Sequence, residues 1–449
     1  MSTGEQGERE RLTLLPPRFR RLRLDERREA VAQAFGRDDA EWDATYCSSA
    51  VAELSDVMVE AAVGSIPVPL GIATGFAIDG EEHVIPMATE EPSVIAACSL
   101  AGRLVSLSGG FSSWATEPVM TAHVYLEGVS SAAEARIKGM EAEVSSELES
   151  CMRRMRDRGG GFRGMEVVRL PETGLVRVEL RVDVRDAMGA NLLNTAAERA
   201  RGLFEITSGG KALMCILSNT AQHRRAGARF SFGVGNLAAV TPAGMAAEEL
   251  ARRIALASEL AQEDPERAVT HNKGIMNGIS ALALATGNDT RAVEAAAHAW
   301  ACRSGRCRGL SRFTLSPGPS GPELTGEMEL PLALGSLGGS VGFHPATAFA
   351  LRLLRHPSAA RLARIAAACG LAQNLAAVLA LVGEGIQKGH MRLHAARAAY
   401  RAGARGEEIA RVATNLAASL AERGSLPDDH ARNILDGLRA GKASERRGQ

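Results

Sequence analysis

The amino-acid sequence predicts an α+β protein, with a large, mostly helical domain, a compact α+β domain inserted into it and a small helical segment at the end. Strand-type and helix-type patterns alternate between 118 and 222, and the chain after 236 is rich in alanine. Glycines between 383 and 389 then precede a final helical region. We therefore expect the first part of the large domain at 1–117 and the insert at 118–222. The second part of the large domain is expected at 223–383 and the C-terminal segment at 384–449.

The composition is that of an ordinary globular enzyme, since 45% of the 449 residues are apolar and 23% are charged. The 52 basic residues balance the 52 acidic ones, so no net field attracts nucleic acid or an anionic membrane. Two uncharged stretches, 61–78 and 365–383, contain prolines or central amides and are predicted to be buried. We expect no nucleic-acid partner and no membrane partner.

The cysteines and histidines predict no metal site. Seven cysteines, an odd number without a secretory leader, indicate a reducing, cytoplasmic setting. Cys302 and Cys307 lack the second close pair that a structural zinc site needs. His390 and His394 have helical spacing, but the glutamate of an H-E-x-x-H motif is missing between them.

Before residue 118, the sequence predicts a charged arm with a helix at 24–35 and a second helix around 46–62. A proline- and glycine-rich stretch with short strands follows, including a turn at Asp79-Gly80. A further helix is expected from Pro92 onward.

The stretch 118–222 follows the order β-α-β-β-α-β, the split βαβ arrangement. Residues 175–185 alternate between apolar and charged side chains, as in a half-buried strand. The expected strands are 120–126, 165–170, 175–185 and 212–217, and the expected helices are 132–158 and 190–203. Beyond 236 we expect helices, interrupted by a hairpin within 316–345.

One of only five lysines, Lys273, lies in the segment THNKGIMNG, with Asn277 and Asp289 close along the chain. The glycines on either side would let backbone approach a ligand, which favours a functional lysine. A surface lysine at a helix end fits the same spacing.

Two further segments contain candidate proton donors. Glu90-Glu91-Pro92-Ser93 stands at a helix start, where acidic residues either cap the helix or, with a raised pKa, act as a general acid. His390 follows Lys388-Gly389 and is either structural or a proton donor carried by a mobile C-terminal segment.

The segment DAMGAN, which begins at Asp186, directly follows the alternating strand and opens a helix. Backbone N–H groups at a helix N-terminus can bind a cofactor phosphate or amide, although a capped turn has the same pattern. The segment is not G-x-G-x-x-G, so a Rossmann domain is not predicted.

Taken together, eight segments resemble class II (bacterial) 3-hydroxy-3-methylglutaryl-CoA reductases, in the family's order, from about residue 12 to the C-terminus. THNKGIMNG, ATGND and DAMGAN are the specific ones. The matching segments are MVEAAVGSIPVPLGIAT, VIPMATEEPSVIAA, VDVRDAMGANLLNT, ILSN, DPERAVTHNKGIMNGI, ATGNDTRAVEAAAHAWACRSG, GLAQNL and EGIQKGHMRLHAARAA.

The resemblance implies a function, a set of site residues and an assembly. It implies reduction of 3-hydroxy-3-methylglutaryl-CoA to mevalonate and CoA, or the reverse, by two hydride transfers through a mevaldehyde-level intermediate. It also implies a homodimer, or a multiple of it, with shared active sites and a ferredoxin-like cofactor-binding insert, and a C-terminal flap. The implied residues are Glu91, Lys273, Asp289 and His390 for catalysis, Ser93, Arg267 and Asn277 for the substrate, and Asp186, Met188, Gly189 and Asn191 for NADH or NADPH.

Two departures from the family pattern affect the expected site. Ala61 replaces an asparagine that would shape the substrate pocket. An acidic residue of NAD-preferring members aligns near Met152, beside Arg153 and Arg154. Because arginines can bind the 2′-phosphate that distinguishes NADPH, we expect NADPH rather than NADH.

Two other functions remain as alternatives. An acyl-CoA lyase or hydratase would use the same acid and lysine without a nicotinamide cofactor, and DAMGAN argues against it. A non-catalytic protein that binds CoA thioesters is the other, and the intact set of four catalytic residues argues against it. The sequence leaves the physiological direction of the reaction open.

Overall fold

The computed structural model describes residues 22–35, 49–319, 321–383, 385, 395–423 and 429–445. The chain divides into two compact units, Met1–Pro69 and Leu70–Gln449. Each unit is described by itself.

In the first unit, α2 (Leu24–Phe35) contacts α4 (Ser49–Met58). Arg28 of α2 is buried, and its Nη1 donates to the carbonyl oxygen of Val63 at 2.7 Å. A buried guanidinium needs such an acceptor, so this bond ties α2 to the chain that follows α4.

The second unit begins with an antiparallel hairpin of β1 (Leu70–Ile78) and β2 (Glu81–Ala88). Asp79 and Gly80 connect the strands with φ values of 51° and 81°. Two successive positive φ values are typical of a type I′ turn, which confirms the turn predicted here. The helix α5 (Val94–Ser106) packs on β1.

A four-stranded antiparallel sheet has the order β3-β8-β10-β9. Its strands are β3 (Ser112–Ala115), β8 (Arg225–Gly233), β9 (Ser311–Gly318) and β10 (Gly321–Pro331). The hairpin of β9 and β10 confirms the one predicted, although it starts earlier. The sequence did not predict β8, so this part of the chain contains more sheet than "mostly helical" implies.

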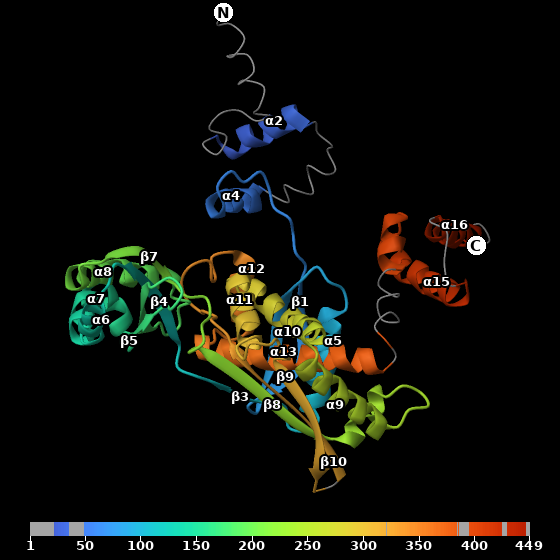
Figure 1. Ribbon diagram of the computed structural model, residues 1–449. Helices are drawn as coiled ribbons and strands as arrows, with labels where there is room; N and C mark the ends of the chain where they lie inside the picture. The colour runs from blue at the N-terminus through green and yellow to red at the C-terminus, as the bar shows by residue number, and fades with distance from the viewer. Residues whose placement is uncertain are drawn as a thin grey trace, which may run out of the picture. The chain divides into compact units, whose positions relative to one another are not determined.

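Helices pack against this sheet, and the most buried of them is α13. The helices are α9 (Ala247–Glu263), α10 (Pro265–Ala285), α11 (Thr290–Ala301), α12 (Pro345–Leu353) and α13 (Ala359–Val382), with a 3-10 turn at Val234–Val240. Among the described residues, only α13 is long and apolar enough to cross a membrane. However, 78% of its apolar window is buried, because it packs against α5, α10 and β8 (Figure 1). Its burial confirms the prediction for 365–383, whereas the prediction that 61–78 is buried is wrong, because most of those residues are half-buried or exposed.

A second four-stranded sheet, antiparallel throughout, has the order β5-β6-β4-β7. Its elements follow one another as β4 (Val119–Glu127), α6 (Ser131–Lys138), α7 (Glu141–Arg156), β5 (Gly161–Arg169), β6 (Val176–Asp183), α8 (Ala190–Ser208) and β7 (Lys211–Leu217). The alternating apolar residues of β6 are buried against these helices.

The single helix predicted at 132–158 is wrong, because the structure has two. Gly139 ends α6, where its N–H donates to the carbonyl oxygen of Arg136 at 3.0 Å. Met140 begins the next turn by accepting from the N–H of Val144. Glycine is the weakest ordinary helix former, so the chain bends there at little cost.

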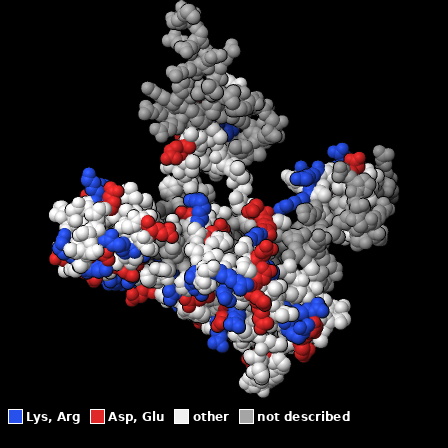
Figure 2. Space-filling model, viewed as in Figure 1, with Lys and Arg blue, Asp and Glu red and all other residues white. Residues whose placement is uncertain are grey.

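The buried apolar residues form separate clusters. One lies around the β3-β8-β10-β9 sheet, the second is almost entirely within 120–221, and the third lies within 395–438. Basic and acidic side chains are interspersed on the described surface shown in Figure 2, as their equal numbers suggest.

Candidate active site

A pocket of about 620 Å³ opens between the start of α5, the middle of α10 and the end of α13. Its lining is mostly apolar, with a few polar and charged side chains, as in many small-molecule sites. Five residues predicted from the sequence line it: Glu91, Ser93, Arg267, Lys273 and Asn277.

Lys273 and Glu91 form the charged pair of this pocket. The Nζ of Lys273 donates to Oε2 of Glu91 at 2.8 Å. The two side chains remain 60% and 36% exposed, so both stay accessible to a ligand. An ammonium beside a carboxyl group can stabilise negative charge on a substrate oxygen and transfer a proton to it.

Ser93 has a left-handed backbone, with φ at 72°, although it is not glycine. It stands at the N-cap of α5, yet its hydroxyl does not cap the helix. Such a conformation costs of order 1–3 kcal/mol and is found most often at functional sites. The hydroxyl of Ser93 is therefore available to a ligand in the pocket.

The alternative that Lys273 is a surface lysine at a helix end is wrong about its position, since Lys273 lies within α10. Its flanking glycines lie against another helix, α13, although Gly274 also lines the pocket. A Cβ on Gly278 would lie 2.9 Å from Cβ of Gln373, and one on Gly370 would lie 2.7 Å from the side chain of Ile279. These glycines let α10 and α13 approach closely, which positions Lys273.

A buried polar network underlies the pocket. Ser311 donates to Oδ1 of Asn374 at 2.7 Å, and Nε2 of His271 lies 2.6 Å from the Ser311 hydroxyl. Since that hydroxyl proton is committed, Nε2 of His271 is the donor. Burial, assisted by Arg267, lowers the pKa of His271 to about 4 and keeps it neutral.

The amide of Asn374 closes the network by donating to the His271 carbonyl oxygen at 3.0 Å. The network joins α10, α13 and β9, so it fixes the position of α10, the helix that contains Lys273. Sequence reasoning missed both residues, although they stand inside the THNKG and GLAQNL segments that it singled out.

The turn from Asp186 to Asn191 connects β6 to α8, as predicted. Gly189 is the N-cap of α8, with φ at 93°, and a Cβ there would lie 2.5 Å from Cγ1 of Val184. Only glycine fits without displacing its neighbours, and it leaves the first N–H groups of α8 free of a side-chain cap. Oδ1 of Asp186 accepts from the N–H of Ala359 at the start of α13, so it also fixes the turn.

Arg224 stabilises the same turn through hydrogen bonds to backbone carbonyl groups. It is buried, and its guanidinium donates to the carbonyl oxygens of Ala187, at 2.9 Å, and Leu334. Burial lowers its pKa to about 10, against the attraction of Asp186 and Asp183. The sequence offered no signal for Arg224, because one arginine among many carries none.

Asp289 lies with this turn rather than with Lys273. Its carboxylate caps α11, accepting from the N–H groups of Arg291 at 3.0 Å and Ala292 at 3.2 Å. The preceding Asn288 exchanges two hydrogen bonds with Gly335, at 2.7 and 3.1 Å.

Gly335 in turn touches the backbone of the turn from Asp186 to Asn191, since a Cβ on it would lie 2.7 Å from the N of Met188. Along α10, the residues from Lys273 to Ala285 span roughly 18 Å at 1.5 Å per residue. Asp289 is not among the residues lining the pocket.

The remaining predicted residues divide into exposed and undescribed ones. Arg153 and Arg154 are exposed in the last turn of α7, where they also complement the helix dipole. Met152 is buried, so a side chain at that position faces the core rather than a cofactor. His390 lies outside the described residues.

Known proteins resemble this chain over nearly its whole length. The sequence profile of hydroxymethylglutaryl-coenzyme A reductase matches residues 23–395. A 3-hydroxy-3-methylglutaryl-coenzyme A reductase of Archaeoglobus fulgidus is 39% identical over 429 residues, covering 94% of each chain. A probable enzyme of the same name from Borreliella burgdorferi is 36% identical, covering 75% of this chain and 76% of its own.

Solved structures give the same result. The 3-hydroxy-3-methylglutaryl-coenzyme A reductase of Streptococcus pneumoniae has a TM-score of 0.71 and 36% identity, covering 94% of this chain and 99% of its own. A structure titled as the class II enzyme of that organism, bound to NADPH in open conformations, has the same TM-score and identity and covers 98% and 100%. The chain therefore belongs to the hydroxymethylglutaryl-coenzyme A reductase family, in its class II.

Proposed function

We propose that this protein is an NAD(P)-dependent oxidoreductase that interconverts 3-hydroxy-3-methylglutaryl-CoA and mevalonate plus CoA. The observation that carries the proposal is the hydrogen bond between Lys273 and Glu91, inside a pocket that Ser93, Arg267 and Asn277 also line. Family membership supplies the reaction. No observation favours the lyase or hydratase, or the non-catalytic alternative.

The chain's own residues account for the main steps. The ammonium of Lys273 stabilises the negative charge that develops on the thioester oxygen. Glu91, hydrogen-bonded to it, supplies the proton to the carbonyl oxygen of the mevaldehyde-level intermediate. Arg267 and Ser93 hold the acyl group, and a guanidinium suits its free carboxylate. His390, proposed from the family resemblance alone, gives its proton to the departing thiolate.

The turn at Asp186, Met188, Gly189 and Asn191 would hold the nicotinamide cofactor, which supplies both hydrides. Its free helix N-terminus and the missing Cβ of Gly189 fit a ligand with phosphates. We propose NADPH rather than NADH, with Arg153 and Arg154 binding its 2′-phosphate. Their exposure and the NADPH-bound relative support this preference.

The same reasoning extends to domains and assembly. We propose a ferredoxin-like cofactor-binding insert at 118–222, supported by the strand order β5-β6-β4-β7, and a helical flap at 384–449. Asp289 and the cofactor turn lie together but apart from the Lys273 pocket. We propose a homodimer in which each active site combines the pocket of one subunit with Asp289 of the partner subunit. A cytoplasmic location fits a chain whose longest apolar helix is buried.

The test is to mix the purified protein with 3-hydroxy-3-methylglutaryl-CoA and NADH or NADPH, and to follow the absorbance of the reduced cofactor. We expect oxidation, faster with NADPH, and its near-complete loss in Lys273→Ala with the fold retained. Lys138→Ala is the matched control, because Lys138 donates to Glu134 at the same 2.8 Å but on α6.

Each part of the proposal has its own refuting result. No oxidation with either cofactor would refute the reductase function. Equal or faster oxidation of NADH would refute the cofactor preference. Full activity in Lys273→Ala, measured beside the Lys138 control, would remove Lys273 from the mechanism.

A further inference from the structure

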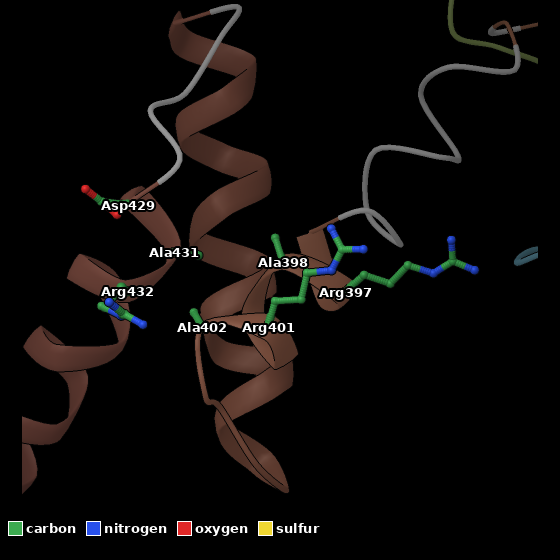
Figure 3. Close-up of a pocket in the computed structure, with 7 residues that line it drawn as sticks. All are labelled: Arg397, Ala398, Arg401, Ala402, Asp429, Ala431 and Arg432. Atoms are coloured by element: carbon green, nitrogen blue, oxygen red, sulfur yellow. The ribbon is translucent and has the colours of Figure 1, made fainter. Parts of the chain in front are cut away.

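Two clusters of arginines lie outside the active-site pocket. One lines a pocket of about 600 Å³ between the helix at 395–401 and α16 (His430–Glu445), which α15 (Glu407–Arg423) separates in the sequence. In Figure 3, Arg397 and Arg401 extend from the same helix. Nη2 of Arg397 donates to the carbonyl oxygen of Glu90 at 3.1 Å, so this pocket adjoins the active site described above. The other cluster lies in the loop after α11 and flanks two cysteines: it consists of Arg303, Arg306 and Arg308, around Cys302 and Cys307.

The loop after α11 brings the two cysteines together. Cys302 is the C-cap of α11, and the N–H of Arg308 donates to the carbonyl oxygen of Ala301 at 3.0 Å. Cys302 and Cys307 are the residues just inside this hydrogen bond. Gly305 closes the loop with φ at 82°, and its N–H donates to the carbonyl oxygen of Cys302 at 2.9 Å. The backbones at the two cysteines are therefore close neighbours, as a disulfide requires.

The two thiols differ in accessibility. Among the cysteines that the structure describes, only Cys302 is exposed, and the loop up to Arg306 is exposed with it. Cys307 is half-buried and packs against the core around the β3-β8-β10-β9 sheet. Burial, followed by the hydrogen bond with the Cys302 thiol, raises the pKa of Cys307. An oxidant therefore meets Cys302 first, with the second thiol already beside it.

The loop keeps a positive charge. Nη1 of Arg303 donates to the carbonyl oxygen of Trp300 at 2.6 Å, and Nη1 of Arg308 donates to that of Gln262 at 3.2 Å. Arg306 lies exposed between them. Hydrogen bonds to neutral carbonyl groups leave the charge of a guanidinium in place, so the loop attracts an anionic reagent.

The segment after the cysteines holds the residue beside the catalytic lysine. The carbonyl oxygen of Arg308, which directly follows Cys307, accepts from Nδ2 of Asn272 at 2.9 Å. The N–H of Leu310 donates to Oδ1 of the same side chain at 2.8 Å. Asn272 is fully buried and immediately precedes Lys273 in α10. A displacement of this segment is therefore transmitted to Lys273 through one buried amide.

We propose that Cys302 and Cys307 form a modification site for anionic low-molecular-weight disulfides, and that the disulfide formed between them lowers turnover at Lys273. The thiolate of Cys302 attacks one sulfur of the reagent, forms a mixed disulfide and releases one thiolate. The thiolate of Cys307 then attacks the Cys302 sulfur and releases the second. The two protons lost by the cysteines pass to the released thiolates, so the reagent is reduced by the two electrons that the cysteines lose.

The effect on turnover rests on the proposed function, whereas the modification itself does not. The new bond draws Cys307 towards Cys302 and displaces the Arg308 carbonyl oxygen from Asn272. Dithiols reverse the modification by the same exchange reaction.

Peptide mapping by mass spectrometry tests the modification without requiring turnover. The full-length protein is incubated with oxidised glutathione and mapped without reduction. In the wild type we expect Cys302 and Cys307 to be joined to each other, with no glutathione retained. In Cys307→Ser the glutathione should stay on Cys302, and in Cys302→Ser the thiol of Cys307 should remain unmodified. Cys215→Ser is the matched control, because it removes a half-buried thiol of β7, and it should give the wild-type map.

The same samples are assayed for oxidation of NADPH in the presence of 3-hydroxy-3-methylglutaryl-CoA. We expect activity about fivefold lower after treatment, the order expected when one buried hydrogen bond near the site is lost, and recovery with dithiothreitol. The double variant Cys302→Ser/Cys307→Ser should keep its activity in oxidised glutathione.

Each step has a result that overturns it. Glutathione retained on Cys302 of the wild type would show that the two thiols do not meet, and an unmodified Cys302 would show that it is not the reactive thiol. A disulfide between the two cysteines with unchanged activity would contradict the coupling to Lys273. Equal loss of activity in the double variant would assign the effect to another cysteine. A wild type inactive before treatment would refute the proposed reductase function, while the disulfide could still be mapped.

Discussion

Replacing Gly189 by alanine should destabilise α8 and the turn from Asp186 to Asn191 far more than the same change at Gly209, the other end of that helix. Both glycines have positive φ, 93° and 70°. Left-handed strain therefore costs alanine roughly 1–2 kcal/mol at either position. At Gly189 a Cβ would also lie 2.5 Å from Cγ1 of Val184, whereas nothing lies within 4 Å at Gly209. Overpacking adds about 1–3 kcal/mol, so we expect losses of roughly 2–5 kcal/mol for Gly189→Ala and roughly 1–2 kcal/mol for Gly209→Ala.

Hydrogen exchange of the α8 amides, followed by mass spectrometry, measures this loss locally in a chain too large for a single unfolding transition. Gly189→Ala should accelerate exchange more than Gly209→Ala and should also weaken NADPH binding, because the turn must shift. Equal acceleration in the two variants would refute the packing argument. Unchanged NADPH affinity in a destabilised Gly189→Ala would separate the turn from the cofactor.

Two further predictions concern charge and assembly. His123 and Arg181 hydrogen-bond to Glu179 and lower the pKa of its carboxyl to about 2. Because this pKa lies below the ordinary value of 4.5, the pairing stabilises the fold fully above pH 4.5. The stabilisation is lost as the pH falls towards 2. Glu179→Gln should thus destabilise β6 by roughly 1–3 kcal/mol at neutral pH and progressively less in acid. Hydrogen exchange of the β6 amides measures this cost locally, and a cost that does not change with pH would contradict the prediction. Lys273→Ala and Asp289→Ala should each be inactive, but subunit exchange between the two variants should restore roughly a quarter of wild-type activity. Half of the dimers are then mixed, and each mixed dimer has one intact site out of two, which combines the unaltered Lys273 of one subunit with the unaltered Asp289 of the other. Sites formed within one subunit would restore nothing.

Much of the site was predictable because its segments have specific residue patterns. The segments THNKG, EEPS and DPERA each contain a residue that lines the pocket. Each segment can be recognised in the sequence without knowing the fold. The roles of the glycines were not predictable. From the sequence, Gly278 was expected to let backbone approach a ligand, but in the structure it lets α10 pack closely on α13. This role could not be predicted, because the part of α13 that faces Gly278 lies about a hundred residues later in the chain.

Strand β8 shows a second limit of sequence patterns. Its buried face consists of Ala226, Ala228, Phe230 and Phe232, so half of the apolar alternation rests on alanine, which favours helices and is depleted in strands. At Gly139 the sequence pattern predicted too much helix. The stretch around Gly139 is charged and favours a helix, and whether one glycine interrupts that helix depends on where α6 and α7 pack.

The sequence by itself determined the reductase family and the residue types of its chemistry, because those residues stand in short local segments that can be recognised without the fold. Only the tertiary structure decided which of them meet. It placed Lys273 against Glu91 across 182 positions of the chain, and it placed Asp289 near the turn from Asp186 to Asn191 through Asn288 and Gly335. Such pairings depend on helix packing and buried hydrogen bonds between distant segments, and no local pattern encodes them.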